Sequence, residues 1–354
     1  MIKVIILSGG FNNKKRGITV SVVVATKDRS SYLRDLLKSL LYQEFKNFEL
    51  IIVDDSENDY HRRMNHAYVR SISSRLKVRL IRNERNIGIP RSLNKGVSVA
   101  KGSIVAFTDD DCIAHPSWLS NLVKWYRYRS IGGVGGKVIP IEMDAIWSVK
   151  ELKEDVDIGR VSWNGDVISN FDLGKGPIIV DCLSGANMSF KREVILEVGG
   201  FSPIYKGNSY RFESELSYRI RKLGYKIVYD PEAVILHRRA LKGGARIDVY
   251  MWNYWLARNH TLFMLRNLDV KFLKLLIFFF KQVSRVARGK RACPYAEPDN
   301  WLRVLLMITK GIVDGIKNHV SFRGEELYRL NASPLSTEVI EAELFEDIRA
   351  GKAH

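Results

Sequence analysis

Cysteine is scarce in this chain of 354 residues, which contains only three. Cys112, Cys182 and Cys293 lie far apart and show no spacing typical of a metal site. So small and odd a number excludes a disulfide framework of the kind that stabilises small secreted domains. We therefore expect the protein to work in a reducing compartment.

The chain also lacks a long, uninterrupted apolar run. Residues 4–7 form an apolar stretch that is too short for a signal peptide or a membrane span. The aromatic stretch at residues 270–290 is interrupted by lysine and arginine well before the ~20 residues that a spanning helix needs. Repeats and low-complexity tracts are absent as well. We expect a cytoplasmic protein, either soluble or bound peripherally to the cytoplasmic face of a membrane.

Acidic residues are few relative to basic ones. The chain has 39 Asp and Glu against 56 Lys and Arg, and its formal net charge is +17. Nucleic acid, an anionic membrane surface and a phosphorylated substrate would each be attracted by this charge. Solubility alone is the other explanation. The length allows one large α/β domain and a smaller appendage.

Apolar β-branched runs alternate with amphipathic stretches from residue 18 to about residue 237. This alternation predicts an α/β fold with a mixed, mostly parallel sheet flanked by helices. The pattern is less regular after residue 132, and a basic, flexible junction at 238–244 precedes a helical carboxyl-terminal region. The predicted strands are 19–24, 49–53, 78–81, 103–107, 225–229 and 234–237, and the predicted helices are 32–41, 191–198 and 213–223.

Three consecutive aspartates end the predicted strand 103–107. Side chains alternate along a strand, so Asp109 and Asp111 share one side, at the strand end where open α/β sheets bind ligands. Hard oxygen donors beside an open space suit Mg²⁺ or Mn²⁺. A polar turn, or an N-cap for a helix starting near residue 116, is the alternative interpretation.

Several further segments occur with this aspartate run in a recognisable order. Together they resemble the inverting, nucleotide-sugar-dependent glycosyltransferases of family 2, over roughly residues 18–240. The resemblance implies the Rossmann-like GT-A fold and the transfer of a sugar to an acceptor hydroxyl. The segments that carry it are 22–29, 53–56, 86–88, 94–96, 109–111, 185–192, 199–201 and 212–219.

The resemblance also implies where a metal cofactor binds. Asp109 and Asp111 would hold Mn²⁺ or Mg²⁺, which offsets the charge that develops on a departing diphosphate. His237 follows the last predicted strand, where related enzymes bring a histidine to the metal or the diphosphate, so we assign it to the metal site. Asp110 should point the other way and hold the loop or the sugar.

A nucleotide site is implied beside the metal. Asp28 and Asp55 are placed to accept hydrogen bonds from the base and the ribose, with Thr26 and Arg29 next to them. Asn94 belongs to the loop before the metal-binding strand and is assigned to the same site. The family most often uses UDP-sugars, which makes them the expected donor, and GDP-sugars remain open.

Inversion requires one general base that removes the proton of the acceptor hydroxyl. We assign Glu213, at the start of the helix 213–223, and Glu215 is its competitor as a carboxylate favoured by the helix dipole. The pattern Gln-x-x-Arg-Trp, associated with processive members, is absent. Transfer of a single sugar is therefore expected.

The basic carboxyl-terminal region interleaves aromatic residues with Lys and Arg between residues 250 and 310. Such helices suit a membrane interface, and an acceptor carried on a glycan lipid or a polyprenyl phosphate would explain them. Packing on the catalytic domain or on a second subunit is the alternative. We expect a catalytic domain at residues 1–240 and a helical region at 241–354.

Two other functions compete with catalysis. A non-catalytic, nucleotide-sugar-binding subunit would keep the fold without turnover. A basic lipid- or nucleic-acid-binding protein would have the acidic loops only by chance. Nucleic acid is not an expected partner, because no recognised module is visible and the aromatics lie within apolar runs.

Overall fold

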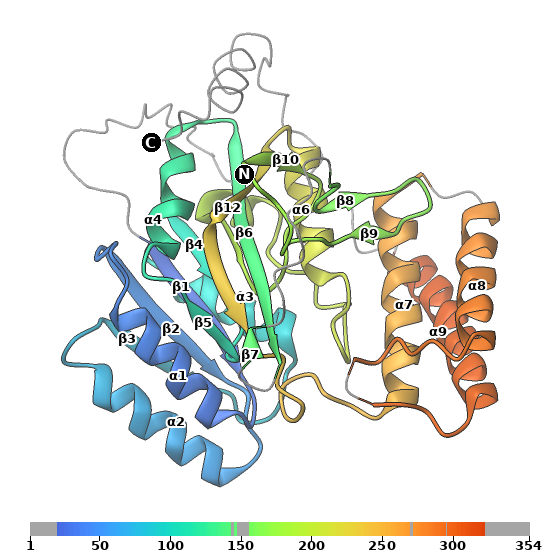
Figure 1. Ribbon diagram of the computed structural model, residues 1–354, viewed down its shortest axis with the longest axis horizontal. Helices are drawn as coiled ribbons and strands as arrows, with labels where there is room; N and C mark the ends of the chain where they lie inside the picture. Colours follow the sequence, from blue (N-terminus) through green and yellow to red (C-terminus); the bar gives the residue numbers. More distant parts are fainter. Residues whose placement is uncertain (1–19, 143–144, 147–155, 270–271, 295, 323–354) are drawn as a thin grey trace, which may run out of the picture.

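The structure, a computed structural model, describes residues 20–142, 145–146, 156–269, 272–294 and 296–322. A mixed, mostly parallel sheet flanked by helices is followed by a separate group of carboxyl-terminal helices (Figure 1). The expected fold class is therefore confirmed.

The main sheet runs in the order β10-β12-β6-β11-β4-β1-β2-β3, with β5 paired to β12 and β7 paired to β6. Strands β1 to β4 are mutually parallel where they pair, β11 is antiparallel to both of its neighbours, and β12 is parallel to β6. A separate hairpin pairs β8 with β9. The strands are β1 (Val20–Thr26), β2 (Phe48–Asp54), β3 (Val78–Arg82), β4 (Ile104–Phe107), β5 (Cys112–Ala114), β6 (Ile131–Glu142), β7 (Ala145–Ile146), β8 (Arg160–Val161), β9 (Val167–Ile168), β10 (Ile178–Val180), β11 (Met188–Lys191) and β12 (Lys226–His237).

Helices cover both faces of the sheet, and three long ones form the carboxyl-terminal group (Figure 1). The helices predicted from sequence at residues 32–41, 191–198 and 213–223 are all present, with ends shifted by one or two residues. The helices are α1 (Ser30–Leu41), α2 (Asp59–Ile72), α3 (Ile89–Val99), α4 (Trp118–Val123), α5 (Arg192–Glu197), α6 (Phe212–Lys222), α7 (Val249–Asn267), α8 (Phe272–Ala287) and α9 (Trp301–Phe322), with a short 3₁₀ turn at Lys124–Arg127.

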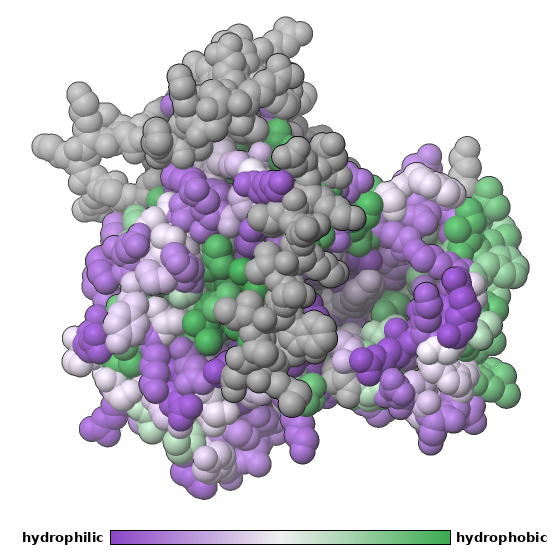
Figure 2. All heavy atoms as spheres, in the orientation of Figure 1, coloured by the Kyte–Doolittle hydropathy of each residue, from purple (hydrophilic) through white to green (hydrophobic). Residues whose placement is uncertain are grey.

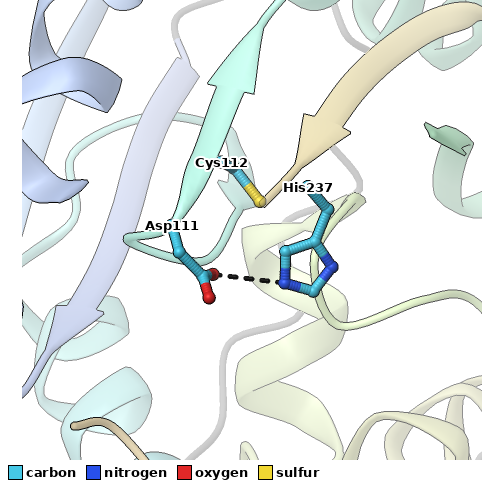
Figure 3. Close-up of side chains that lie close together, drawn as sticks. All are labelled: Asp111, Cys112 and His237. Atoms are coloured by element: carbon cyan, nitrogen blue, oxygen red, sulfur yellow. Dashed lines mark ion pairs between the residues drawn. The ribbon is translucent and has the colours of Figure 1, made fainter. Parts of the chain in front are cut away.

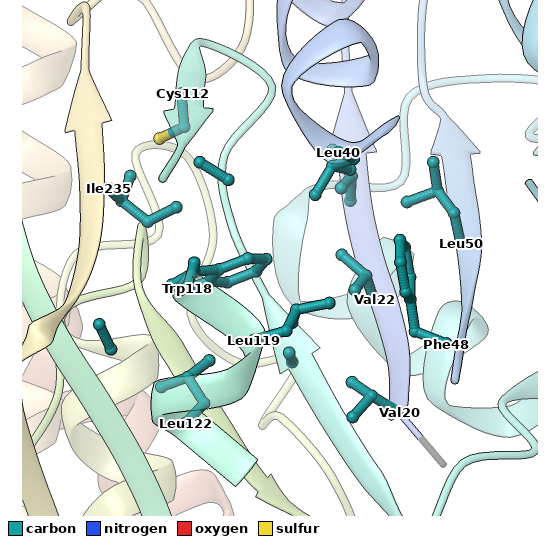
Figure 4. Close-up of a cluster of buried hydrophobic side chains, with 14 of the residues drawn as sticks. Val20, Val22, Leu40, Phe48, Leu50, Cys112, Trp118, Leu119, Leu122 and Ile235 are labelled. Atoms are coloured by element: carbon teal, nitrogen blue, oxygen red, sulfur yellow. The ribbon is translucent and has the colours of Figure 1, made fainter. Parts of the chain in front are cut away.

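The hydrophobic core lies on both faces of the sheet because side chains alternate along β1. Val20, Val22 and Val24 pack with α1 and α4 in one cluster, which Figure 4 shows around Trp118. Val23 points to the opposite face and joins a second cluster that includes α3, α5 and α6. A strand buried on both faces explains why the sequence here is continuously apolar rather than alternating.

Strand β6 is the longest strand that the sequence pattern did not predict. Its glycines lower the intrinsic preference for a strand, yet close packing requires them. A Cβ at Gly135 would lie 2.6 Å from the carbonyl oxygen of Asn187, and one at Gly133 would lie 2.5 Å from the Phe190 ring. The crowded centre of the sheet therefore excludes larger residues, and the sequence appeared irregular for that reason.

The two strands predicted on either side of Asp230 form one strand, β12. Its pairing with β6 shifts register between Asp230 and Ile235, and Pro231 lies within this irregularity. Proline lacks a backbone N–H and is tolerated in sheets at such interruptions. Beyond the shift, β12 also pairs with β5 and ends at His237.

The predicted domain boundary at residue 240 falls between β12 and α7, and parts of both predicted domains, residues 1–19 and 323–354, lie outside the described residues. The limits of the domains stay a prediction. Among the described helices, none combines the length and the apolar character needed to cross a membrane.

Candidate active site

A cavity of about 560 Å³ lies at the carboxyl ends of β1, β2, β4 and β12. Thr26, Asp55, Asp109 and His237 line it from these strand ends, and Glu213 lines it from the start of α6. Parallel strands point their carboxyl ends to one edge, which brings together residues as far apart in sequence as Thr26 and His237. A second cavity of about 290 Å³ shares Glu213 and His237 with the first.

Asp109 and Asp111 face the same histidine. The Oδ2 atom of Asp109 lies 3.9 Å from the Nε2 atom of His237, and the Oδ1 atom of Asp111 lies 3.2 Å from it. Figure 3 shows Asp111, Cys112 and His237 converging from neighbouring segments. Burial alone would lower the pKa of His237, but the two carboxylates raise it above its ordinary value.

This arrangement fits a hard divalent cation. The Asp109 side chain is 47% exposed, whereas that of Asp111 is buried, and its Oδ1 atom accepts no hydrogen bond. Burial raises the pKa of the Cys112 thiol well above its ordinary value, and the two carboxylates add to the effect. Two carboxylates and an imidazole are donors that Mn²⁺ or Mg²⁺ accepts, whereas a neutral thiol is a poor ligand for either ion.

Asp110 points away from this histidine, as alternation along the chain predicts. Its Oδ2 atom accepts a hydrogen bond of 2.7 Å from Thr26, and its Oδ1 atom accepts one of 3.0 Å from Arg29. Burial raises the pKa of Asp110 to about 6, although the Arg29 guanidinium opposes the shift. Thr26 and Asp110 thus bond to each other in the described structure and hold the turn that presents Asp109.

Arg29 joins three segments of the site. Its Nη1 atom donates to Asp110 and, at 3.2 Å, to Asp111, while Nε and Nη2 donate to the carbonyl groups of Lys242 and Gly243. Burial would raise the pKa of Asp111, but His237 and Arg29 hold it well below the ordinary value. The guanidinium therefore compensates the aspartate run and fixes the loop after β12.

Glu213 and Glu215 have different surroundings although they lie two residues apart. Glu213 lines both cavities, and burial raises its pKa to about 7, with a further contribution from Asp109. Glu215 is 1% exposed and accepts two hydrogen bonds, of 2.7 and 2.8 Å, from Arg219. Only Glu213 is placed to meet a ligand in the cavities.

A family model described as Glycosyl transferase family 2 matches residues 21–199, half of the chain. This chain belongs to glycosyltransferase family 2. Membership makes it a nucleotide-sugar-dependent enzyme, as the order of motifs predicted. The alternative of a basic lipid- or nucleic-acid-binding protein with incidental acidic loops is therefore not supported.

Two curated relatives each match more than three fifths of this chain. The glucosyl-dolichyl phosphate glucuronosyltransferase of Haloferax volcanii is 30% identical over 229 residues, which are 62% of this chain and 69% of that protein. An uncharacterized glycosyltransferase of Haemophilus influenzae is 27% identical over 238 residues, 65% of this chain and 68% of that protein.

Solved structures confirm the GT-A fold. S. aureus TarS, residues 1–349 with UDP-GlcNAc, superposes with a TM-score of 0.53 at 16% identity, covering 89% of this chain and 95% of that one. GalNAc-T7 with UDP, GalNAc and Mn²⁺ superposes with a TM-score of 0.53 at 18% identity, covering 88% of this chain and 58% of that one.

In this family 2 glycosyltransferase, the residues assigned to the nucleotide also hold neighbouring loops. Asp55 accepts hydrogen bonds of 3.0 Å from the backbone N–H groups of Ile87 and Gly88 and lines the main cavity. Asp28 accepts from the N–H groups of Glu57 and Asn58 and is not among the residues that line the described cavity.

Arg246 and Trp252 line the main cavity of the glycosyltransferase although the sequence did not single them out. Both follow β12: Arg246 lies just beyond the stretch interpreted as a flexible junction, and Trp252 lies in the region interpreted as interfacial helices. Arg246 contributes a positive charge that acts on Asp109. The basic run that begins directly after His237 was the available signal, because it places cations next to an acidic strand end.

Asn94 differs from the other assigned residues. Its Nδ2 atom donates to the carbonyl oxygen of Phe201 at 2.7 Å, and its Oδ1 atom accepts from the N–H group of Phe201 at 2.7 Å. Its side chain is not among those that line the described cavity. In the described structure Asn94 uses its amide to hold the glycine turn after α5, and its assignment to the nucleotide site stays a prediction.

Asn94→Ala separates this structural role from a contact with the nucleotide. The substitution leaves the Phe201 peptide without its partners, so we expect the free energy of unfolding to fall by about 2 kcal/mol, with UDP affinity unchanged. Chemical denaturation and calorimetry measure the two quantities. Asn121→Ala is the control, because the bond from Asn121 to the Glu232 carbonyl lies at the surface, where water replaces it. Loss of UDP affinity at unchanged stability would restore the nucleotide role.

Proposed function

We propose that this enzyme transfers one sugar from a nucleoside-diphosphate sugar to an acceptor hydroxyl, with inversion at the anomeric carbon. The observation that carries the proposal is the placement of Glu213 in the same cavity as Asp109 and His237. Such a reaction requires two parts: carboxylates that bind a metal ion, and a separate carboxylate that acts as a base. Burial raises the pKa of the second, Glu213, to about 7.

Asp109, Asp111 and His237 would hold the metal, Mn²⁺ or Mg²⁺. When bound, the ion offsets the negative charge that develops on the departing diphosphate. Arg246 lines the same cavity and adds a fixed positive charge for that group. Asp55, at the end of β2, remains the proposed contact for the nucleoside.

Glu213 would act on the acceptor side. Its carboxylate takes the proton of the acceptor hydroxyl while the oxygen bonds to the anomeric carbon. The bond from that carbon to the diphosphate oxygen breaks on the opposite face, so the configuration inverts. The smaller cavity, which Glu213 and His237 border, offers space for the acceptor.

The donor and acceptor classes follow from the relatives as proposals. UDP-sugars are the expected donors, since two of the similar structures hold UDP or UDP-GlcNAc. A lipid-phosphate-linked acceptor is proposed because the Haloferax volcanii relative is named for glucosyl-dolichyl phosphate. The absence of Gln-x-x-Arg-Trp supports transfer of one sugar per encounter.

Nucleotide binding tests the metal site. We expect UDP to bind more tightly with Mn²⁺ than with EDTA, and Asp109→Asn to weaken the metal-dependent part at least about tenfold. Isothermal titration calorimetry measures both affinities. Asp59→Asn is the matched control, because the Asp59 side chain is 81% exposed on α2. Equal UDP affinity in Mn²⁺ and in EDTA would contradict the metal assignment.

Glu213→Gln tests the base. We expect kcat to fall by about 10²–10⁴ with UDP affinity and stability nearly unchanged, because glutamine keeps the shape but cannot take the proton. Glu215→Gln is the comparison: it removes the buried charge that pairs with Arg219, which keeps its bonds to the Val198 and Gly200 carbonyl groups, and should lower the free energy of unfolding by about 1–3 kcal/mol. Steady-state rates and thermal unfolding separate the two. A larger fall in kcat for Glu215→Gln than for Glu213→Gln, in folded protein, would reverse the assignment.

The pKa of Glu213 predicts a pH profile. The base must be ionised, and burial raises its pKa to about 7, so kcat/KM should fall about tenfold per pH unit below that value. The residual rate of Glu213→Gln should lack this acidic limb. Rates measured across pH 5–9 under saturating metal test the profile. If kcat/KM of the wild type fell only below about pH 4, the base would be an exposed carboxylate rather than Glu213.

A further inference from the structure

The carboxyl-terminal helices expose apolar side chains that the proposed chemistry does not use. On α8, Phe272 is 73% exposed and Phe280 is 62% exposed, and on α9 Leu302 is 67% exposed. Figure 2 shows hydrophobic side chains gathered along the edge of the molecule over α8. Contiguous exposed apolar surface on a soluble domain marks a site of interaction.

The exposed residues of α9 form one stripe. Leu302, Leu306, Val313, Ile316 and Val320, here called the α9 stripe, follow one another at steps of four, seven, three and four residues. With 3.6 residues per turn, this spacing places all of them on one face of the helix.

The opposite face of α9 is already packed. Val304 and Ile308 are fully buried in a cluster that also contains residues of α7 and α8. A Cβ at Gly315 would lie 2.9 Å from the carbonyl oxygen of Arg258, so α9 meets α7 at close range. The α9 stripe is therefore a second apolar face, on the side of the helix away from α7.

Positive charges follow the edge of the stripe. Arg303, Lys310 and Lys317 are spaced by seven residues and so lie in a row beside it. The Arg303 guanidinium lies 4.0 Å from the centre of the Tyr250 ring, which fixes it at this edge. Helix α8 contains no acidic residue, and the carboxylate of Asp314, the one acid of α9, accepts a hydrogen bond from Tyr254.

We propose that the α9 stripe and its row of cations bind the surface of an anionic lipid bilayer. Apolar side chains would enter the interface while Arg303, Lys310 and Lys317 meet lipid phosphates. An antiparallel two-fold pairing of α9 with that of a second copy would bring the two rows of cations to the same side, which like charges oppose. A nucleic acid could contact the cations but would leave the apolar side chains of the α9 stripe exposed to water. This inference does not depend on the proposed chemistry.

Flotation of the full chain with vesicles tests the apolar part. We expect binding to vesicles that contain phosphatidylglycerol and much weaker binding to phosphatidylcholine alone. Leu306→Gln with Val313→Gln should reduce binding at least about tenfold, because two apolar side chains no longer enter the interface. Leu196→Gln is the control, since Leu196 is 49% exposed on α5, in the catalytic region.

Charge reversal tests the cationic row. Each basic residue at an anionic surface contributes about fivefold to partitioning, so Lys310→Glu with Lys317→Glu should reduce it at least about 25-fold. Lys38→Glu with Lys101→Glu changes the net charge equally at exposed positions on the sheet domain and should have a smaller effect.

Three results would overturn the proposal: no flotation of the wild type, equal losses in the test and control variants, or a solution dimer that the glutamine pair dissociates. UDP binding, measured in parallel, should be the same in every variant. Its absence in the wild type would contradict the proposed function and leave the membrane result intact.

Discussion

Three adjacent carboxylates at the end of a buried strand are stable only if cations compensate them, and Arg29 supplies much of that compensation. Its guanidinium contacts Asp110 and Asp111 and also two carbonyl groups of the loop after β12. Gly244 makes the contact possible, because a Cβ there would lie 2.5 Å from the guanidinium carbon. The glycines of the junction therefore let the backbone approach Arg29 closely. The loop that carries Arg246 is positioned by the same cluster of charged groups.

The aspartates and glutamates of the site differ in exposure and bonding because their surroundings differ. Asp109 is half exposed and free to meet a ligand, Asp110 is bonded to Thr26, and Asp111 is buried against His237 and Arg29. The same contrast separates Glu213, whose pKa burial raises to about 7, from the paired Glu215. Desolvation favours the neutral acid at Glu213, whereas His237 and Arg29 favour the anion at Asp111. The proposed metal site and the proposed base thus consist of the same functional group in different surroundings.

The parts of the site that depend on local order were predictable from sequence. An apolar run followed by Asp109 to Asp111 determines which side chains share a side, and a helix start places Glu213. Asn94 was not predictable, because its role depends on Phe201, 107 residues away. Strand β6 was missed because its glycines satisfy packing across the sheet rather than strand propensity. Contacts between distant segments decide such positions, and a single sequence does not encode them as a pattern.

Helix α7 connects the catalytic cavity with the carboxyl-terminal surface. Trp252, near its beginning, lines the cavity, and further along the helix Ala257 and Met264 pack in the cluster shared with α8 and α9. The α9 stripe lies on the far side of α9, so a bilayer bound there would be separated from the cavity by the α7–α9 pair. An acceptor anchored in that bilayer would have to reach Glu213 around this pair. The requirement favours an acceptor whose reacting hydroxyl lies several sugars beyond the lipid phosphate over one whose hydroxyl belongs to the sugar next to that phosphate.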